Sequence, residues 1–391
     1  MNGDNLSIAL FMSSYPPRKC GIATFTRDLT EAVDFSSKFQ TKILAIDDPS
    51  NHYEYPSKVL YHLKDYDYDQ YIKIANHIND NASIKVVCIQ HEFGIFCGEQ
   101  SCHPLPFLDN LKKPAVITFH SVFPTPQDEI KKLVRAISKR VKNIVVMTNK
   151  AVEILRKDYE IETPISVIPH GIPEVNLESQ FSYKRRINLS DKLILSSFGM
   201  VSPGKGYEYV IDSLPEVVKK FPNVLYLIVG ATHPGVIEEE GESYRDFLIK
   251  KIKNLELEKN VAFHNEYVST EKIIQYLKAT DIYMSTSQNP EQITSGTLSY
   301  AMGCGRAVVS TPFPHAADII KENNGLIVDY DKPEEFARAI LCLLSNTEKR
   351  KAFELNNYNL TRQMTWKNVG KEYGNLMNSL VIKHPPSNSF I

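Results

Sequence analysis

Short apolar runs alternate with segments of helical length along the whole chain, and this alternation restricts the possible folds more than any other feature. Runs of this kind, rich in Val and Ile, are typical of strands that are buried on both faces of a parallel sheet. They lie at residues 7–12, 41–46, 85–90, 115–119, 143–147 and 165–168, and again at 193–198, 224–229, 260–264, 281–285, 306–310 and 325–328. The two series predict an α/β protein with two Rossmann-like, doubly wound domains.

The segment between the two series has the composition of a linker. Residues 169–190 are largely polar, show no clear period and contain Gly171 and Pro173, so we expect a hinge near Gly171. This divides the chain into an N-terminal domain over residues 1–180 and a C-terminal domain over residues 181–363. Residues 364–391 begin with an amphipathic helical pattern that holds the only tryptophan, Trp366.

Size, charge and cysteine content narrow the classes of function. The 391 residues are enough for two buried cores, and 45 basic against 46 acidic side chains give no general preference for nucleic acid. No run approaches the ~18 apolar residues of a membrane span, and the beginning of the sequence lacks the pattern of a signal peptide. The six cysteines are scattered, as is usual for reduced thiols. We therefore expect a cytoplasmic protein.

Two candidate binding features have simple alternatives. Cys97 and Cys102, with His91 and His103 nearby, suggest a metal site, but the spacing is loose and no second cysteine pair follows, so we expect neither metal nor cofactor. Residues 130–150 contain no acidic residue and begin with a basic amphipathic pattern. This pattern is typical of a helix packed on a sheet with its lysines in water; the alternative is a weak, peripheral contact with the inner membrane surface.

The stretch of residues 281–311 is the most informative part of the sequence. It indicates a strand, a polar loop that contains Glu291, a helix that begins at Gly296, a Gly-x-Gly turn and a second strand. Such a loop places an acid and the free N–H groups of a helix at the carboxyl edge of a sheet, where open α/β sheets bind ligands. The alternative is an ordinary βαβ unit whose glycines serve only close packing.

The order of residues in this stretch resembles the donor-sugar motif of the retaining family-4 (group 1) glycosyltransferases of the GT-B fold. The matching residues are Pro290, Glu291, Gly296, Ala301, Met302, Gly305, Val308 and Val309. The family carries two glutamates eight positions apart, and counting back from Gly305 these fall on Gln292 and Tyr300. Glu291 thus matches with a shift of one residue, and the second glutamate is absent. The resemblance implies two Rossmann-like domains facing a cleft, a C-terminal helix that returns to the N-terminal domain, and donor contacts from Gln292, Thr294, Ser295, Gly296 and Thr297.

A second motif, FGMVSPGKGY at residues 198–207, follows another predicted strand. It is close to a P-loop, but Gly206 stands where a P-loop has its magnesium-binding hydroxyl. It also resembles the family's G-R-x-x-x-x-K-G turn, in which Gly199, Lys205 and Gly206 are kept and Met200 replaces the arginine. The resemblance implies that this turn binds the donor phosphate, and that residues 267–268 (Tyr267 and Val268) hold the nucleotide base.

Three strand ends in the N-terminal half carry further candidate residues. After the first strand the chain turns and enters a helix near Gly21, with Arg18 and Lys19 adding positive charge. In the family this loop meets donor phosphate or acceptor. His91 and Glu92 close the third strand and are candidates either for acceptor binding or for capping of loops. His120 closes the fourth and matches the family's histidine near the donor sugar; the alternative is a structural hydrogen bond.

The predicted function is transfer of a hexosyl group from a nucleotide-sugar donor to a hydroxyl of a carbohydrate or glycolipid acceptor, with retention at the anomeric carbon. His120 and Glu291 are the predicted catalytic residues, and no metal is required. Two alternatives remain open. The missing arginine and glutamate are consistent with a phosphorylase that uses a sugar 1-phosphate, and the same fold could serve a non-catalytic sugar-binding subunit.

Overall fold

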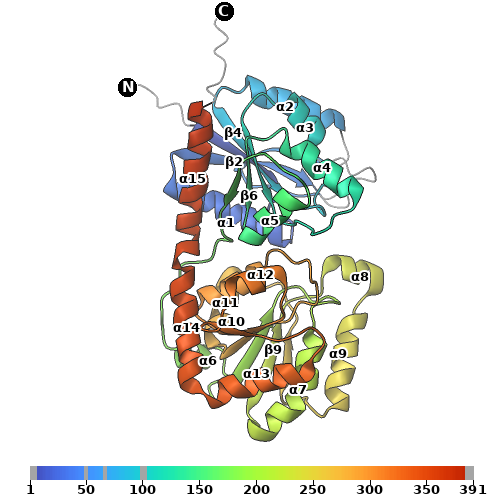
Figure 1. The fold of residues 1–391 in the computed structure, drawn as a ribbon. Coiled ribbons are helices and arrows are strands. Elements are labelled where there is room, and N and C mark those ends of the chain that lie inside the picture. The colour runs from blue at the N-terminus through green and yellow to red at the C-terminus, as the bar shows by residue number, and fades with distance from the viewer. Residues whose placement is uncertain (1–6, 48–51, 65–67, 97–103, 384–391) are drawn as a thin grey trace, which may run out of the picture. The chain divides into compact units, whose positions relative to one another are not determined.

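The structure, a computed structural model, describes residues 7–47, 52–64, 68–96 and 104–383. The chain forms two compact units, which Figure 1 colours from blue at the N-terminus to red at the C-terminus. The first consists of Met1–Gly171 and Met364–Ile391, and the second of Ile172–Gln363. The first unit thus ends at Gly171, the expected hinge, rather than at residue 180, and the segment from Met364 onward groups with the N-terminal half.

All strand pairs of the first unit's sheet are parallel, in the order β3-β2-β1-β4-β5-β6-β7. The strands are β1 Ser7–Ser13, β2 Phe39–Asp47, β3 Val59–Lys64, β4 Ile84–His91, β5 Ala115–Phe119, β6 Asn143–Val146 and β7 Ile165–Val167. The strand β3 was not predicted from the sequence, because His62 and Lys64 interrupt its apolar pattern. It lies at the edge of the sheet, where a strand is covered less completely than in the centre.

The helices of the first unit are α1 Gly21–Ser36, α2 Tyr68–Asp80, α3 Leu105–Asn110, α4 Asp128–Ser138, α5 Asn149–Lys157 and α15 Trp366–Lys383. Residues 130–150 therefore do not form one continuous basic helix, because α4 ends at Ser138 and the rest enters β6 and α5. Ion pairs also neutralise part of the positive charge of these residues. Lys131 and Arg135 each lie 2.8 Å from a Glu160 oxygen, and Arg140 lies 2.5 Å from Asp109.

Two glycines allow α15 to lie directly against α1, as Figure 1 shows for the two helices. A Cβ atom on Gly370 would lie 2.5 Å from the Ala32 carbonyl carbon, and one on Gly374 would lie 2.5 Å from the Ser37 Cβ. Around these contacts, Val369, Tyr373 and Met377 of α15 are buried in the core under α1. The spacing of four residues puts both glycines on the same face of α15.

The second unit repeats the plan with the order β10-β9-β8-β11-β12-β13, again all parallel. Its strands are β8 Leu193–Phe198, β9 Val224–Val229, β10 Val261–His264, β11 Ile282–Ser285, β12 Ala307–Ser310 and β13 Gly325–Ile327. Its helices are α6 Gln180–Arg186, α7 Tyr207–Lys220, α8 Pro234–Glu240, α9 Ser243–Asn254, α10 Thr270–Ala279, α11 Gly296–Gly303, α12 Pro314–Ile319, α13 Pro333–Ser345 and α14 Thr347–Thr361. In both sheets the first four strands by sequence lie in the order 3-2-1-4, as in the Rossmann fold.

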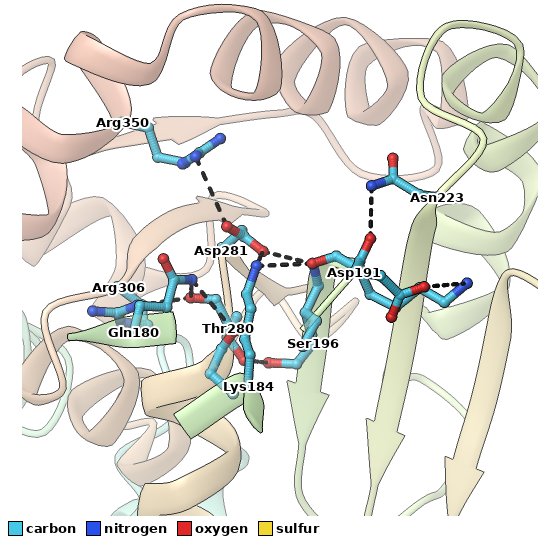
Figure 2. A network of polar contacts seen from close by, with 12 residues as sticks. Gln180, Lys184, Asp191, Ser196, Asn223, Thr280, Asp281, Arg306 and Arg350 are labelled. Atoms are coloured by element: carbon cyan, nitrogen blue, oxygen red, sulfur yellow. Dashed lines mark hydrogen bonds and ion pairs between the residues drawn. The ribbon is translucent and has the colours of Figure 1, made fainter. Parts of the chain in front are cut away.

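A buried ion pair fixes the central strands of the second unit at their amino ends (Figure 2). The Asp281 Oδ2 atom accepts hydrogen bonds from Lys184 Nζ at 2.5 Å and from the Ile194 amide at 2.7 Å. The Asp281 amide in turn donates to the Ile194 carbonyl at 2.8 Å. Arg350 lies 3.8 Å from the other carboxylate oxygen. This network ties α6 and α14 to the point where β8 and β11 begin.

The close contact between α1 and α15 leads to a first prediction. Alanine has the higher helix propensity by about 1 kcal/mol, so Gly370→Ala would stabilise a solvent-exposed helix. Here the added methyl group has no room, and overpacking costs roughly 1 to 3 kcal/mol. We therefore expect Gly370→Ala to lower the denaturant midpoint of the first unit, measured by Trp366 fluorescence. Gly94→Ala is the control, because its Cβ would meet nothing within 4 Å. Equal midpoints for the two variants would contradict this packing.

Candidate active site

Two loops meet at the carboxyl edge of the second sheet, where the strand order reverses between β8 and β11. The turn after β8 holds Gly204 and Gly206, with φ angles of +78° and +71° that favour glycine. A Cβ on Gly206 would lie 2.2 Å from the Thr286 carbonyl oxygen in the loop after β11. The approach of the two loops therefore requires glycine at residue 206.

Hydrogen bonds hold the same two loops together. The Thr286 hydroxyl donates to the Lys205 carbonyl at 2.5 Å, and the Gln288 amide donates to the Gly204 carbonyl at 2.8 Å. Gly199, also in the turn after β8, lies beside α11: a Cβ on it would be 3.6 Å from the Thr297 methyl group. The predicted phosphate turn and the predicted sugar loop thus form one cluster.

Lys205 is half-buried in this cluster, and its ammonium has no hydrogen bond or ion pair among the described residues. Burial lowers the pKa of Lys205, as expected for a cation with no neighbouring anion. The next residue, Gly206, is the N-cap of α7 and has no capping side chain, so free N–H groups of the helix remain beside it. Glu208, in the first turn, accepts a hydrogen bond from the Tyr244 hydroxyl at 2.5 Å. An anion at Lys205 would satisfy both the ammonium and the helix dipole.

The loop after β11 places the two candidates Glu291 and Gln292 differently. The Glu291 side chain is exposed and makes no hydrogen bond to other described residues, although its amide donates to the Asn289 side chain at 2.9 Å. Gln292 is half-buried, with Oε1 accepting from the Ser287 hydroxyl at 2.6 Å and Nε2 donating to the Thr294 carbonyl at 3.2 Å. Gln292 thus shapes the loop, whereas Glu291 is available to a ligand.

The N-terminus of α11 is fixed by a residue that the sequence analysis missed. Ser295 is the N-cap and accepts from the Leu298 amide at 3.3 Å, and its hydroxyl lies 3.2 Å from that of Thr297. The Ser295 amide itself donates to Nδ1 of the buried His315 at 2.8 Å. His315 lies in α12, after the next strand, and no local sequence pattern relates it to Ser295. With Ser295 held by His315, the first amides of α11, beginning at Gly296, lie at the edge of the cluster.

The predicted base-binding segment follows β10. Val268 is buried, whereas Tyr267 is 47% exposed. The preceding Asn265 is bonded to the buried Arg245, which also donates to the Thr232 hydroxyl at 2.9 Å. Arg245 therefore joins the loops after β9 and β10.

In the first unit, His120 lies at the carboxyl end of β5 and is almost fully buried. Its Nε2 atom is 3.0 Å from Gln90 Oε1, which can only accept, so the neutral ring carries its proton on Nε2. Gln90 Nε2 donates to the Thr118 hydroxyl at 3.3 Å, and that oxygen is 2.9 Å from the Tyr373 hydroxyl of α15. Burial, and secondarily the charge of His170, lower the pKa of His120 to about 3. The ring is neutral at physiological pH, with Nδ1 left as an acceptor.

His91 and Glu92, at the end of β4, lie along the same carboxyl edge of the first sheet. His91 is buried among aromatic rings, stacked on Phe96 at a centroid distance of 5.4 Å, which indicates a packing role. Glu92 accepts from the Ser121 hydroxyl at 2.7 Å and from the Phe93 amide at 3.0 Å, and burial raises the pKa of its carboxyl.

Two further candidates belong to the loop that leads from β1 into α1. Arg18 is half-buried and donates to the Ile46 carbonyl at 3.3 Å. Gly21, the first residue of α1, is exposed, and a Cβ there would meet nothing within 4 Å. Neither its conformation nor its surroundings in this unit require glycine.

Among the described residues, no three His, Cys, Asp or Glu side chains gather in a way that could hold a metal ion. The suggested metal residues Cys97, Cys102 and His103 lie outside the described ranges. The described helices also include none that has both the length and the apolar character needed to cross a membrane.

Fold and site together define a two-unit, doubly wound α/β protein with a half-buried lysine at a helix N-terminus, unpaired within the part of the chain that the structure describes. Residues 179–360 match the family described as Glycosyl transferases group 1, and residues 21–174 match the Glycosyltransferase Family 4 description. The matches extend over both units, and the chain belongs to the group 1 glycosyltransferases of the GT-B fold.

Comparison with individual proteins is consistent with this family. An uncharacterized glycosyltransferase of Methanocaldococcus jannaschii is 28% identical over 249 residues, which are 63% of this chain and 58% of the relative. Spore coat protein SA of Bacillus subtilis is 25% identical over 170 residues, or 43% of each protein. The chain thus spans about half the length of these curated relatives.

Solved structures match over nearly the whole chain. Anabaena HepE, crystallised in complex with UDP and glucose, gives a TM-score of 0.74 at 15% identity, covering 95% of this chain and 99% of HepE. Sucrose-phosphate synthase from Thermosynechococcus elongatus gives a TM-score of 0.74 at 14% identity, covering 96% and 100%. At this level of identity the similarity concerns the fold.

The buried, neutral histidines His120 and His170 lead to a prediction of how the stability of the first unit depends on pH. Burial lowers the pKa of His120 to about 3 and that of His170 to about 4, both below the ordinary value of 6.5 that applies to the unfolded chain. Their stabilising effect is complete above pH ~6.5 and is lost as the pH falls, because the unfolded chain then binds more protons. We expect the free energy of unfolding, measured by Trp366 fluorescence, to fall between pH ~6.5 and ~4, and His120→Gln to reduce this slope. An unchanged slope in the variant would contradict a neutral His120.

Proposed function

We propose that the protein is a retaining glycosyltransferase that moves a hexosyl group from a nucleotide-sugar donor to a hydroxyl of a carbohydrate or glycolipid acceptor. The observation that carries this proposal is the half-buried Lys205 ammonium, which lacks a partner among the described residues, beside the uncapped N-terminus of α7. The diphosphate of a donor would supply the missing negative charge. The family to which the chain belongs and the UDP bound to HepE support this choice of ligand.

Lys205 and the α7 N-terminus would act most strongly as the reaction proceeds. The bond between C1 of the hexose and the phosphate oxygen breaks, and negative charge grows on the departing diphosphate. A preorganised cation and free N–H groups lower the energy of that charge. The acceptor oxygen bonds to C1, and its proton passes to the departing phosphate. No step requires a metal ion.

The sugar ring gains positive charge in the same step, which a nearby carboxylate stabilises. Glu291 is the acid of the loop after β11, and its exposed carboxylate is free to meet the ring. His120 would contribute as a neutral group: its Nε2–H is occupied by Gln90, so Nδ1 can accept a hydrogen bond from a sugar hydroxyl. Because its pKa is about 3, His120 would not serve as a proton donor at neutral pH.

A phosphorylase that uses a sugar 1-phosphate is the second candidate, favoured by one observation. Met200 stands where the family has an arginine, so the turn after β8 offers Lys205 as its cation. A thermal-shift panel of UDP, GDP, ADP and orthophosphate separates the two functions, because a selective ligand raises the melting temperature by mass action. Stabilisation by a nucleoside diphosphate supports the transferase, and stabilisation by orthophosphate alone supports the phosphorylase.

The role of Lys205 is tested by calorimetry. A charge-assisted contact contributes about 1.5 to 3 kcal/mol, so Lys205→Ala should weaken UDP binding by roughly 10- to 150-fold. Lys219→Ala is the matched control, since Lys219 is exposed at the other end of α7. Met200→Arg should tighten UDP binding by restoring the second cation. Wild-type affinity in Lys205→Ala would rule out this phosphate site.

The role of Glu291 is tested by steady-state kinetics with the donor that the thermal-shift panel selects. Glu291→Gln keeps the size of the side chain and removes its charge, so kcat should fall by at least about tenfold while UDP affinity stays unchanged. Wild-type turnover in this variant would show that its carboxylate does not meet the hexose. Gln292, the residue in register with the family's glutamate, would then be the next to replace.

A further inference from the structure

A cluster of aromatic and charged side chains lies at the carboxyl ends of β2 and β3, outside the residues to which a role has been assigned above. Asp47, the last residue of β2, accepts a hydrogen bond from the Tyr55 hydroxyl at 2.7 Å through Oδ1. Its Oδ2 lies 2.9 Å from Nδ1 of His62 in β3. Tyr53 adds a third ring, with its centroid 5.8 Å from that of Tyr55. We call Asp47, Tyr53, Tyr55 and His62 the β2–β3 cluster.

The exposure of these side chains is unusual for a structural cluster. The Asp47 side chain is only 12% exposed, whereas His62, which it holds, is 63% exposed. Tyr53 and Tyr55 are half-buried, and Tyr55 packs with one side against the core of this unit. A buried carboxylate that served the core would be expected to bind buried donors. Here it holds an exposed imidazole and a half-buried tyrosine in fixed orientations, which is the preorganisation that a binding site needs.

The chemistry of the cluster suits a carbohydrate. Aromatic rings offer apolar faces to the C–H groups of a sugar ring, and a few fixed polar groups beside them determine its orientation. Because the Asp47 carboxylate can only accept, Nδ1 of His62 donates to it, and Nε2 of the exposed ring is left to meet a hydroxyl group. Arg18 lies close by: its Nη1 donates to the carbonyl of Ile46, the neighbour of Asp47. Burial and then Asp47 raise the pKa of Tyr55, and the charge of Arg18 opposes this effect.

The position of the cluster in the sheet indicates the size of the ligand. The strand order is β3-β2-β1-β4, and the crevice at the reversal of strand order lies between β1 and β4. With neighbouring strands about 4.8 Å apart, β2 and β3 lie on the order of 10 to 14 Å from β4. A ligand that reached both the crevice and the β2–β3 cluster would be longer than one hexose.

We propose that the β2–β3 cluster is a subsite for the non-reacting part of the acceptor, and that the acceptor is accordingly an oligosaccharide or a glycoside of several sugar units. This inference rests on the proposed transferase function. It assigns to Tyr53, Tyr55 and His62 the binding of a sugar ring beyond the one that receives the hexose. The buried Asp47 is the positioning residue that holds Tyr55 and His62 in place.

Saturation-transfer NMR of the full chain with saturating UDP tests this subsite. The probes are maltotriose, cellotriose, mannotriose and chitotriose, each beside its monosaccharide. We expect at least one trisaccharide to bind more tightly than its monosaccharide. Tyr53→Ala and His62→Ala should each weaken that binding by about tenfold, equivalent to roughly 1.4 kcal/mol. Tyr55→Phe, which keeps the ring and removes its bond to Asp47, should give a smaller loss.

Two controls separate this inference from the proposed function. Tyr68→Ala removes an exposed tyrosine of the same unit that lies outside the cluster, and should bind the trisaccharide normally. UDP affinity, measured by calorimetry, should be unchanged in all four variants. If UDP binds but no trisaccharide binds, or if Tyr53→Ala and His62→Ala bind it as the wild type does, the subsite is refuted while the transferase proposal stands. If the wild type does not bind UDP, the proposed function fails instead.

Discussion

The second unit depends on the way its two central strands, β8 and β11, are joined. At their amino ends Asp281 binds the Ile194 amide and the Lys184 ammonium, so the strands begin in a fixed register (Figure 2). At their carboxyl ends the loops are tied by the bonds of Thr286 to Lys205 and of Gln288 to Gly204. Between these anchors the strand order reverses: the chain continues from β8 to β9 and β10 on one side of the sheet, and from β11 to β12 and β13 on the other. The Lys205 turn and the Glu291 loop therefore lie together, although more than eighty residues separate them.

The same polar group is used in two different ways in the two units. Asp281 is buried with a buried lysine, and such a pair costs desolvation that is offset only by complete hydrogen bonding. The Asp281–Lys184 pair fixes the register of two buried strands, β8 and β11. Asp47 is also shielded from water, but its partners are rings that remain partly exposed. The β2–β3 cluster thus extends from the edge of the core, where Tyr55 packs, to the exposed imidazole of His62.

His120 shows how burial limits the chemistry available to a residue. The bond to Gln90 and the network through Thr118 to Tyr373 link the end of β5 with a helix from the far end of the chain. With a pKa of about 3, the imidazole cannot work as an acid at neutral pH. Its place at a strand end was predictable from the sequence. Its protonation state was not, because that depends on the aromatic and histidine side chains packed around it.

The class of fold was predictable from local patterns, since short apolar runs spaced by helical segments are typical of parallel sheets covered by helices. The sequence also located the turn at Gly199–Gly206 and the loop around Glu291, because glycine and a helix start are local signals. Tertiary structure decided what depends on contacts between distant segments. It joined His315 to Ser295, turned Gln292 inward and left Glu291 outside, and brought Asp47 to Tyr55 and His62. It also revealed β3, whose pairing with β2 outweighs its interrupted apolar pattern, because strand pairing is a property of the sheet and not of one segment.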